Sequence, residues 1–335
     1  MFREKRVLFL IAETPVHAGS GSEVGVVDLP IQRERYTDFP KIESSGLKGC
    51  IREAFESANK EIDINGEKVR PKNKIQYKKD NQDKETDYIS LLFGPEGEET
   101  HAGAFTITDA RILLFPVKSL KGVFAWITCP MVLERFKRDQ EIAGISHFNF
   151  SDFSKLVNTV PQSSNIAISS KVVLEEFTFE VREKEETKKL AEWFSNNIFP
   201  NNDSYRFWRE KIKKDLVILN DDDFKQFVKT STEIMTRTKI DNVTGTVQSG
   251  ALWTEEYLPQ DTIMYSLVMF TQLRVEEDDK KGIFKAINNP DNEVKLVAEF
   301  FEKGLPEVIQ IGGNQTIGKG FVRVKFLRQE DKNAS

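Results

Sequence analysis

A short, continuous apolar run near the N-terminus constrains the fold more than any other feature of this chain. The run "RVLFLIA", at Arg6–Ala12, has the length and uniform hydrophobicity of a central β-strand. A second apolar run, "TIMYSLVMF" at 262–270, and the segment Phe321–Phe326 predict further strands. The segments "TKKLAEWFSNNIF" and "DNEVKLVAEFFEKGL" predict helices. We therefore expect an α+β fold.

The composition allows a sizeable core and argues against a generally basic protein. The chain has 335 residues, of which 39% are hydrophobic, so it can bury a core. Its net charge of −5 does not fit a histone-like or tail-driven nucleic-acid binder, so any site for a polyanion must be local. The two cysteines, Cys50 and Cys129, are far apart, which excludes a disulfide framework or a CxxC metal site. We expect both thiols to be buried.

The N-terminal residues predict a strand rather than a signal peptide. Their apolar run is short, and no small-residue cleavage site follows it. No stretch approaches the roughly 20 apolar residues that a membrane span needs. We therefore expect a soluble, cytoplasmic protein with no membrane partner.

The segment "KIESSGLKGCIREAFESANK" predicts a helix with one buried face. Ser44 or Ser45 can cap its first turn. Its apolar residues follow helical spacing: Leu47, Ile51, Ala54, Phe55 and Ala58. Lys48 and Arg52 lie four residues apart, so both project from one side of the helix. Taken alone, these two cations indicate a solvated charged face.

A polar stretch follows this helix, at about 59–87. It mixes both charges and is nearly free of aliphatic residues, which is typical of a surface insertion or a mobile loop. After it, "YISLLFG" predicts a short helix that ends at Gly94. The segment "AGAFTITDARILLFPV" predicts either one long strand or a pair of strands.

The segment "TEIMTRTKIDNVTGTVQSGALWTEEYLP" predicts a long hairpin that is too polar to be a core element. Arg237 and Lys239 alternate with Thr and Ile, and a turn signal follows at 241–245. Hairpins with little apolar alternation usually project from the body of a protein, and projections usually contact a partner.

A glycine cluster near the C-terminus is the second candidate binding element. It contains Gly312, Gly313, Gly318 and Gly320, with Lys319 among them and no acidic residue from 309 to 329. Glycines let backbone N–H groups approach phosphate oxygens closely. The spacing fits neither a P-loop nor a dinucleotide-binding fingerprint, so a tight turn before a strand is an equally good interpretation.

Asp28 stands alone in the segment "VVDLPIQRER". It could cap the turn at Leu29–Pro30, as aspartate often does, bind a metal ion, or take part in chemistry. The local sequence alone favours the cap.

Five segments together resemble the RAMP superfamily, namely "TPVHAGSG", "VVDLPIQRE", "SSGLKGCIREAF", "TRTKIDNVTGTVQSGALWTEEYLP" and "IGGNQTIGKGFVRV". More narrowly, the chain resembles the backbone subunit of the type III-B CRISPR effector, the Cmr complex. The resemblance covers nearly the whole chain in the same order. It implies a single RAMP domain over 1–335 with a ferredoxin-like or RRM-like core, large insertions at about 59–87 and 183–223, and a projecting "thumb" hairpin at about 231–259.

The resemblance also implies an endoribonuclease site. In the resembled subunit, the aspartate that matches Asp28 is required for cleavage of target RNA. With a divalent cation, Mg²⁺ or Mn²⁺, such a carboxylate can align a ribose 2′-hydroxyl for in-line attack, leaving a 2′,3′-cyclic phosphate and a 5′-hydroxyl. His17 is a candidate general base, or it contacts the guide backbone or stabilises its own loop. Glu255, Glu256 and Tyr257 can either assist the chemistry or brace the hairpin.

The resemblance further implies RNA and protein partners. We expect Lys48, Arg52, Lys319 and the four glycines to contact guide RNA phosphates without reading sequence. Arg237 and Lys239 belong to the hairpin that would wedge between blocks of guide–target base pairs. Further copies of the chain would join head to tail in an open helix, together with other Cmr subunits.

Two alternatives stay open at this point. One is a guide-binding RAMP subunit that does not cleave, in which Asp28 is only a turn residue. The other is an unrelated ferredoxin-like enzyme that binds a small phosphorylated ligand at the glycine cluster.

Overall fold

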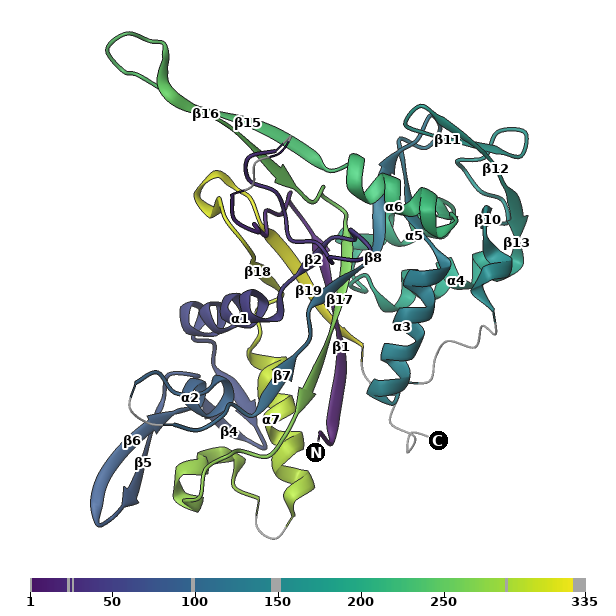
Figure 1. The fold of residues 1–335 in the computed structure, drawn as a ribbon. Helices are drawn as coiled ribbons and strands as arrows, with labels where there is room; N and C mark the ends of the chain where they lie inside the picture. Colours follow the sequence, from purple (N-terminus) through teal and green to yellow (C-terminus); the bar gives the residue numbers. More distant parts are fainter. Residues whose placement is uncertain are drawn as a thin grey trace.

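One large mixed sheet runs through the protein (Figure 1). The computed structural model describes residues 2–22, 25, 27–97, 100–145, 152–286 and 289–327. In spatial order the strands of the sheet are β13 (Arg182–Lys184), β10 (Thr159–Pro161), β14 (Leu216–Ile218), β9 (Phe124–Thr128), β8 (Ala110–Lys118), β17 (Ile263–Phe270), β1 (Glu4–Ala12), β19 (Phe321–Leu327) and β18 (Val308–Gln310). Two short strands, β2 (Lys41–Ile42) and β7 (Phe105–Ile107), pair with β8 and β17.

β1 is a central strand, as its apolar run predicts. It pairs antiparallel with β17 on one side and with β19 on the other. Four successive side chains, Val7 to Leu10, are at most 2% exposed. The sequence forms a strand here because both faces of the run find apolar neighbours.

Helices cover both faces of the sheet around β1. Their bounds are α1 (Ser44–Ala58), α2 (Tyr88–Phe93), α3 (Pro130–Ala143), α4 (Glu185–Asn197), α5 (Arg206–Ile212), α6 (Asp221–Thr230) and α7 (Pro290–Gly304). On one face, Phe9 of β1 packs against Phe136 of α3 and Trp193 of α4. On the other face, Phe301 of α7 packs against Phe270 of β17 and Phe55 of α1. None of the helices in the described ranges combines the length and apolarity needed to cross a bilayer.

The chain visits the middle of the sheet in the order β1, α1, β8, β17, α7, β19, and these four strands lie in the spatial order β8, β17, β1, β19. All three pairings are antiparallel. The segment expected to be one long strand or a pair forms β7 and β8, which pair with successive stretches of β17. The protein is therefore a mixed α/β structure built on one sheet.

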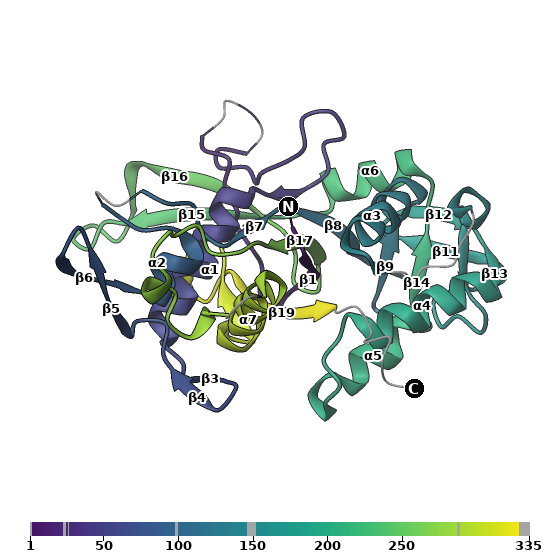
Figure 2. The ribbon, with the colours of Figure 1, turned by 90° about the horizontal axis from the view of Figure 1, so that it is seen from below.

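Residues 124–145 and 152–230 form an outer lobe that extends the sheet beyond β8, seen at the right of Figure 2. Besides β9, β10, β13, β14 and helices α3 to α6, it contains the hairpin of β11 (Lys171–Leu174) and β12 (Phe177–Glu180), and the 3₁₀ helices η1 (Phe153–Leu156) and η2 (Asp203–Tyr205). The range 183–223, expected as an insertion, lies inside this lobe. β14, within that range, pairs with both β9 and β10.

The polar range 59–87 forms two hairpins, β3 (Ile62–Ile64) with β4 (Glu67–Val69) and β5 (Lys74–Lys79) with β6 (Gln82–Asp87). The expectation of a mobile loop was therefore wrong for this segment, whereas its position at the surface agrees with Figure 1. Ile62, Ile64 and Tyr77 are at most 3% exposed. These few apolar side chains alternate with charged ones, which is enough to anchor short strands.

Helix α1 begins differently from the prediction. Its N-cap residue is Glu43, which makes no side-chain cap bond, so the expectation of a serine cap was wrong. Instead, the amide of Ser44 donates to Oδ1 of Asp109 at 2.9 Å, and a carboxylate is favourable at this end of a helix. Cys129 is buried as expected, but Cys50 on α1 is only half-buried.

A hairpin of β15 (Glu233–Ile240) and β16 (Val247–Tyr257) forms a separate two-stranded sheet. Figure 1 shows it projecting from the body at the upper left. Its turn is closed by Asp241, whose carboxylate accepts the amides of Val243 and Thr244. Two 3₁₀ helices, η3 (Asp278–Phe284) and η4 (Gln315–Ile317), complete the described elements.

Candidate active site

Three segments far apart in the sequence meet at the base of the hairpin. Val16 exchanges backbone hydrogen bonds with Leu258, just after β16. Leu29 bonds to the backbone of Thr254 and Glu256, so it forms an isolated parallel bridge to β16 at Glu255. The glycine cluster closes the arrangement, because the amide of Gly313 donates to the carbonyl of His17 at 3.0 Å.

Asp28 is exposed at this junction and is fixed through one carboxylate oxygen. Its Oδ2 accepts from the backbone amide of Thr254 at 2.7 Å and from the Thr254 hydroxyl at 2.8 Å. The amide of Asp28 in turn bonds to the Thr254 hydroxyl oxygen at 3.0 Å. Within the described chain, Oδ1 has no partner. The Thr254 amide, followed by its hydroxyl, holds the pKa of the Asp28 carboxyl below its ordinary value, so the group is ionised at neutral pH.

The cap on the Leu29–Pro30 turn is not the role of this carboxylate. Among the described residues, the side-chain bonds of Asp28 go to Thr254 on the hairpin, 226 residues away in the sequence. Asp28 is therefore a carboxylate with one fixed and one available oxygen, held at the base of a projecting element.

Glu256 braces the loop that carries Asp28. Its side chain is buried, and Oε1 accepts from Arg33 at 2.5 Å and from the Thr232 hydroxyl at 2.8 Å. Oε2 accepts from the amide of Ile31 at 3.0 Å. With both oxygens engaged, this glutamate is occupied in holding residues 31–33 against β16.

Glu255 is the centre of a second buried network. Its Oε2 accepts from Tyr257, from Asn314 at 2.9 Å and from Arg237 at 3.2 Å, and Oε1 accepts from Trp253 at 2.9 Å. Burial would raise the pKa of Glu255, but the bonds from Tyr257, Trp253 and Arg237 outweigh it and hold that pKa below its ordinary value. The network joins both hairpin strands to the glycine cluster.

Tyr257 is fully buried, and its hydroxyl takes part in the same hydrogen-bond network as Glu255. The hydroxyl donates to Glu255 and accepts from Asn314 at 2.7 Å and from Arg237 at 3.0 Å. Burial and the neighbouring Glu255 raise the pKa of Tyr257, so it stays protonated at neutral pH. In this arrangement Glu255 and Tyr257 brace the hairpin.

His17 lies beside this network, half-buried. Its Nδ1 lies 2.7 Å from the carbonyl oxygen of Glu256. A carbonyl only accepts hydrogen bonds, so Nδ1 is the donor and Nε2 is the nitrogen left to act as an acceptor in the neutral ring. The ring packs against Tyr257, with 5.4 Å between centroids. Gly19 leaves room for Nε2, since a Cβ at Gly19 would lie only 2.8 Å from it.

Two glycines of the cluster, Gly312 and Gly320, serve close packing inside the protein. A Cβ on Gly312, whose φ is +81°, would lie 2.1 Å from the carbonyl oxygen of His17. A Cβ on Gly320 would lie 2.2 Å from the carbonyl oxygen of Ile311. The amides of Gly313, Gly318 and Gly320 donate to carbonyls of His17, Gln315 and Pro15. These amides are therefore already used within the chain.

The predicted cations fall into two groups. Lys319 lies over the Tyr257 ring at 5.4 Å, and Arg237 is part of the Glu255 network. Lys239 lies farther along the same hairpin and is exposed. Lys48 and Arg52 lie apart from these, on α1. There Lys48 packs over the Phe105 ring at 4.8 Å, and Arg52 pairs with Glu56 and Glu96.

The residues present do not form a protein-built metal site. Over the described ranges, no group of three or more His, Cys, Asp or Glu side chains could hold a metal ion. Glu255 and Glu256 use both their oxygens, and Asp28 offers one. One carboxylate oxygen does fit an ion such as Mg²⁺, which often takes its other ligands from water and substrate phosphates.

Sequence reasoning missed Thr254, Asn314 and Arg33, although all three hold predicted residues in place. Asn314 has a left-handed backbone, with φ of +67°, and an asparagine within a glycine-rich turn is the one signal that could have indicated it. Thr254 and Arg33 carry no local signal, because their partners are distant in the sequence.

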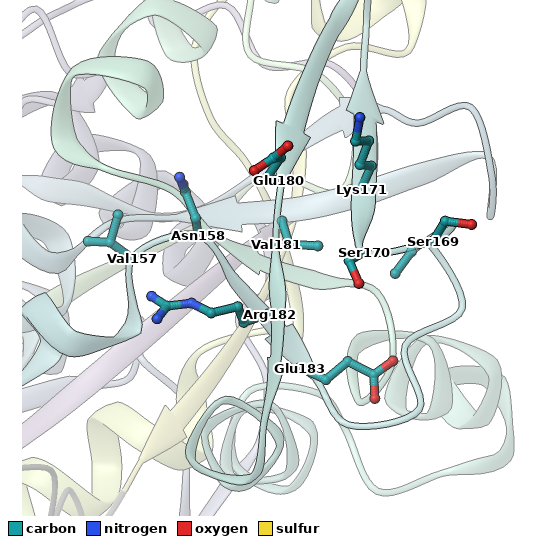
Figure 3. Close-up of a pocket in the computed structure, with 10 residues that line it drawn as sticks. Val157, Asn158, Ser169, Ser170, Lys171, Glu180, Val181, Arg182 and Glu183 are labelled. Atoms are coloured by element: carbon teal, nitrogen blue, oxygen red, sulfur yellow. The ribbon is translucent and has the colours of Figure 1, made fainter.

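A cavity of about 970 Å³ in the outer lobe contains none of the predicted site residues. Figure 3 shows Lys171, Glu180, Arg182 and Glu183 along its lining. Cations and carboxylates alternate there, so the cavity presents no single charge to a ligand.

Comparison with known proteins agrees, over almost the whole chain, with the RAMP resemblance found in the sequence. The RAMP superfamily model matches residues 9–323. The CRISPR system Cmr endoribonuclease Cmr4 of Pyrococcus furiosus is 40% identical over 319 residues, which is 93% of this chain and 92% of that protein.

Solved structures agree with this assignment. The crystal structure of oligomeric Cmr4 from Pyrococcus furiosus matches with a TM-score of 0.68 and 32% identity, covering 98% of this chain and 99% of the other. A chain of the type III-B Cmr-beta complex bound to cognate target RNA matches with a TM-score of 0.63 and 20% identity, and the match covers 97% of this chain and 98% of the other. The two proteins therefore share a fold. The narrower resemblance to the type III-B backbone subunit is confirmed, and the chain belongs to the RAMP superfamily.

Proposed function

We propose that this protein is the backbone subunit of a type III-B CRISPR ribonucleoprotein, which coats guide RNA and cleaves base-paired target RNA at regular intervals. Its relative Cmr4 of Pyrococcus furiosus supports this, since that protein is named an endoribonuclease and its crystal structure is that of an oligomer. The observation that carries the catalytic part is Asp28, an exposed, ionised carboxylate with one available oxygen at the base of the hairpin.

The proposed reaction is in-line attack of a ribose 2′-hydroxyl on the adjacent phosphorus. The P–O5′ bond breaks, leaving a 2′,3′-cyclic phosphate and a 5′-hydroxyl. Such a reaction depends mainly on geometry, because nucleophile, phosphorus and leaving oxygen must lie in line. The hairpin would supply that geometry by wedging between short blocks of guide–target pairs and displacing one nucleotide.

Asp28 would act beside a divalent cation, Mg²⁺ or Mn²⁺. Oδ1 would be its one protein ligand, with water and RNA phosphate oxygens completing the shell. When bound, the cation would stabilise charge on the phosphate. His17, through Nε2, is the candidate to take the proton from the 2′-hydroxyl. Glu255, Glu256 and Tyr257 hold the hairpin and the loop in place.

RNA binding is proposed for the hairpin and its surroundings. Arg237, Lys239 and Lys319 supply positive charge on or beside it, in a chain whose net charge is −5. Charge of this kind binds phosphates without reading bases, which suits a subunit that accepts any guide. Lys48, Arg52 and the four glycines stay predicted guide contacts, although the amides of Gly313, Gly318 and Gly320 already donate within the chain. The ferredoxin-like core implied by the resemblance would be the unit β1, α1, β8, β17, α7, β19.

The test is cleavage of a guide-complementary RNA by the reconstituted complex. We compare Asp28→Asn with Asp38→Asn, a matched change in the same loop whose carboxylate pairs with Lys225 and Lys229 at the surface. Asp28→Asn should abolish the regularly spaced cuts while the complex still assembles, and Asp38→Asn should cut normally. Chelation of divalent cations should also stop cleavage. If Asp28→Asn cuts at the wild-type rate, the subunit binds guide RNA without contributing this carboxylate to catalysis.

A further inference from the structure

Thr254 holds the Asp28 carboxylate with both its backbone and its side chain. The amide and the hydroxyl of Thr254 donate to the same oxygen, Oδ2, at 2.7 and 2.8 Å. The amide of Asp28 closes the ring by donating to the Thr254 hydroxyl oxygen at 3.0 Å. Two donors on one oxygen fix the rotation of the carboxylate, and they select which of its two oxygens stays available.

The contact joins two different elements of the chain. Asp28 belongs to a loop of the body, whereas Thr254 lies on β16 of the projecting hairpin. Residues 28 and 29 touch β16 only at its base, where the amide of Leu29 donates to the carbonyl of Thr254 at 3.0 Å. A displacement of the hairpin base away from residues 28–33 would therefore release the carboxylate.

The hairpin face that carries Thr254 is uncharged beyond the buried Glu256. The register pairs Ile234 with Glu256, Thr236 with Thr254 and Thr238 with Leu252, so these six side chains share one face. Arg237 lies on an alternate position of β15 and points to the opposite face, and Lys239 lies at the register shift that follows Thr238. A substitution at Thr254 therefore does not alter the face of the hairpin from which Arg237 projects.

We propose that Thr254 is a positioning residue of the ribonuclease site, which orients Asp28 and makes cleavage depend on the hairpin being seated. This inference rests on the proposed function. Thr254 does not touch the reacting atoms. It leaves Oδ1 as the oxygen that can meet RNA or its cation, and it keeps Oδ2 turned toward β16.

The activity test compares three variants of the assembled complex in single-turnover cleavage of a guide-complementary RNA. Thr254→Val removes the hydroxyl but keeps the β-branched shape and the amide. We expect its cleavage rate at saturating target to fall on the order of 10- to 100-fold, with unchanged affinity for target RNA. Thr254→Ser restores a hydroxyl and should return to within a few-fold of the wild-type rate. Thr236→Val, directly opposite on β15 and exposed, is the matched control and should cleave normally.

A second measurement, the pKa of the Asp28 carboxyl, tests the hydrogen bond between Thr254 and Asp28 without a cleavage assay. The free chain is labelled with ¹³C at aspartate carboxyls, and the signal of Asp28 is assigned by its loss in Asp28→Asn. In Thr254→Val the pKa of Asp28 should rise toward its ordinary value of about 3.9, whereas in Thr254→Ser and Thr236→Val it should stay low.

The two measurements separate failure of the inference from failure of the proposed function. A Thr254→Val complex that cleaves at the wild-type rate overturns the inference, and so does a loss that Thr254→Ser does not restore or that Thr236→Val shares. If the wild-type complex does not cleave at all, the proposed function fails. The titration then still decides whether Thr254 orients Asp28.

Discussion

Arg33 joins the loop that carries Asp28 to two other parts of the protein at once. Its Nη2 donates to Glu256 at 2.5 Å, and its Nη1 donates to the carbonyls of Asp38 and Val228 at 2.8 and 3.0 Å. Val228 lies in α6, which leads directly into the hairpin. One guanidinium therefore ties together the loop, the end of α6 and the base of β16.

Loss of the Glu256 carboxylate should destabilise the whole protein. Glu256→Ala leaves the Arg33 guanidinium without its anion and the Ile31 amide without an acceptor. Removing one partner of such a buried pair should lower the free energy of unfolding by roughly 3 kcal/mol. The control is Glu210→Ala, whose pair with Lys213 is exposed and should change stability by about 0.5 kcal/mol or less. Chemical denaturation measures both, and equal effects would contradict the bracing role.

Two glycines of the cluster should respond differently to the same substitution. Gly312 and Gly318 both have left-handed backbones, with φ of +81° and +77°, so alanine should cost either one about 1–2 kcal/mol. At Gly312 the new Cβ also meets the His17 carbonyl oxygen at 2.1 Å, whereas at Gly318 it meets open space. Gly312→Ala should therefore cost about 1–3 kcal/mol more than Gly318→Ala. Thermal unfolding of the two variants checks this, and a smaller loss at Gly312 would show that the loop can shift away from His17.

Asp261 should make the protein less stable at neutral than at acidic pH. Burial and the nearby Glu13 carboxylate raise the pKa of Asp261 to about 6. A carboxyl with a raised pKa in the folded state contributes stability that is present below its unfolded value, about 3.9, and is lost as the pH rises through about 6. Asp261→Asn should stabilise the protein at pH 7 by roughly 1–2 kcal/mol after allowance for its partial exposure. Asparagine also tolerates the φ of +67° at this position.

Urea unfolding at several pH values between 4 and 8 tests this effect. The gain from Asp261→Asn should be large at pH 7 and absent near pH 4. Asp241→Asn is the control, because amide hydrogen bonds in the hairpin turn lower the pKa of Asp241, so this change should bring no gain at pH 7. A gain from Asp261→Asn that does not vary with pH would assign it to the backbone rather than to ionisation.

Local periodicity made much of the fold predictable. β1, α2, α7 and β19 follow from apolar runs or helical segments that each element carries within itself. The start of α1 was not predictable, because the group that satisfies it, Asp109, lies between β7 and β8. The hairpins of 59–87 were missed because a few buried residues such as Ile64 and Tyr77 stand among many charges.

The site shows the same division. The sequence brought His17, Asp28, Glu255, Glu256 and Tyr257 forward as candidates, and the structure brings all five to one junction. The sequence could not show that Glu255, Glu256 and Tyr257 hold the hairpin in place while Asp28 keeps a free oxygen. That distinction depends on which side-chain oxygens already accept hydrogen bonds within the chain. Thr254 is the clearest case, because its bond to Asp28 spans 226 residues and no local pattern reports it.

The hairpin is joined to the rest of the described chain by hydrogen bonds that lie at residues 254–257. A two-stranded ribbon has little stability of its own, so its direction is set at that end. Eleven residues of β16 span roughly 35 Å at about 3.3 Å each. The element is thus a lever arm, in which a rotation of about 5° at Tyr257 moves the tip at Val243 by about 3 Å. A small change at the site is therefore coupled to a larger displacement at the tip.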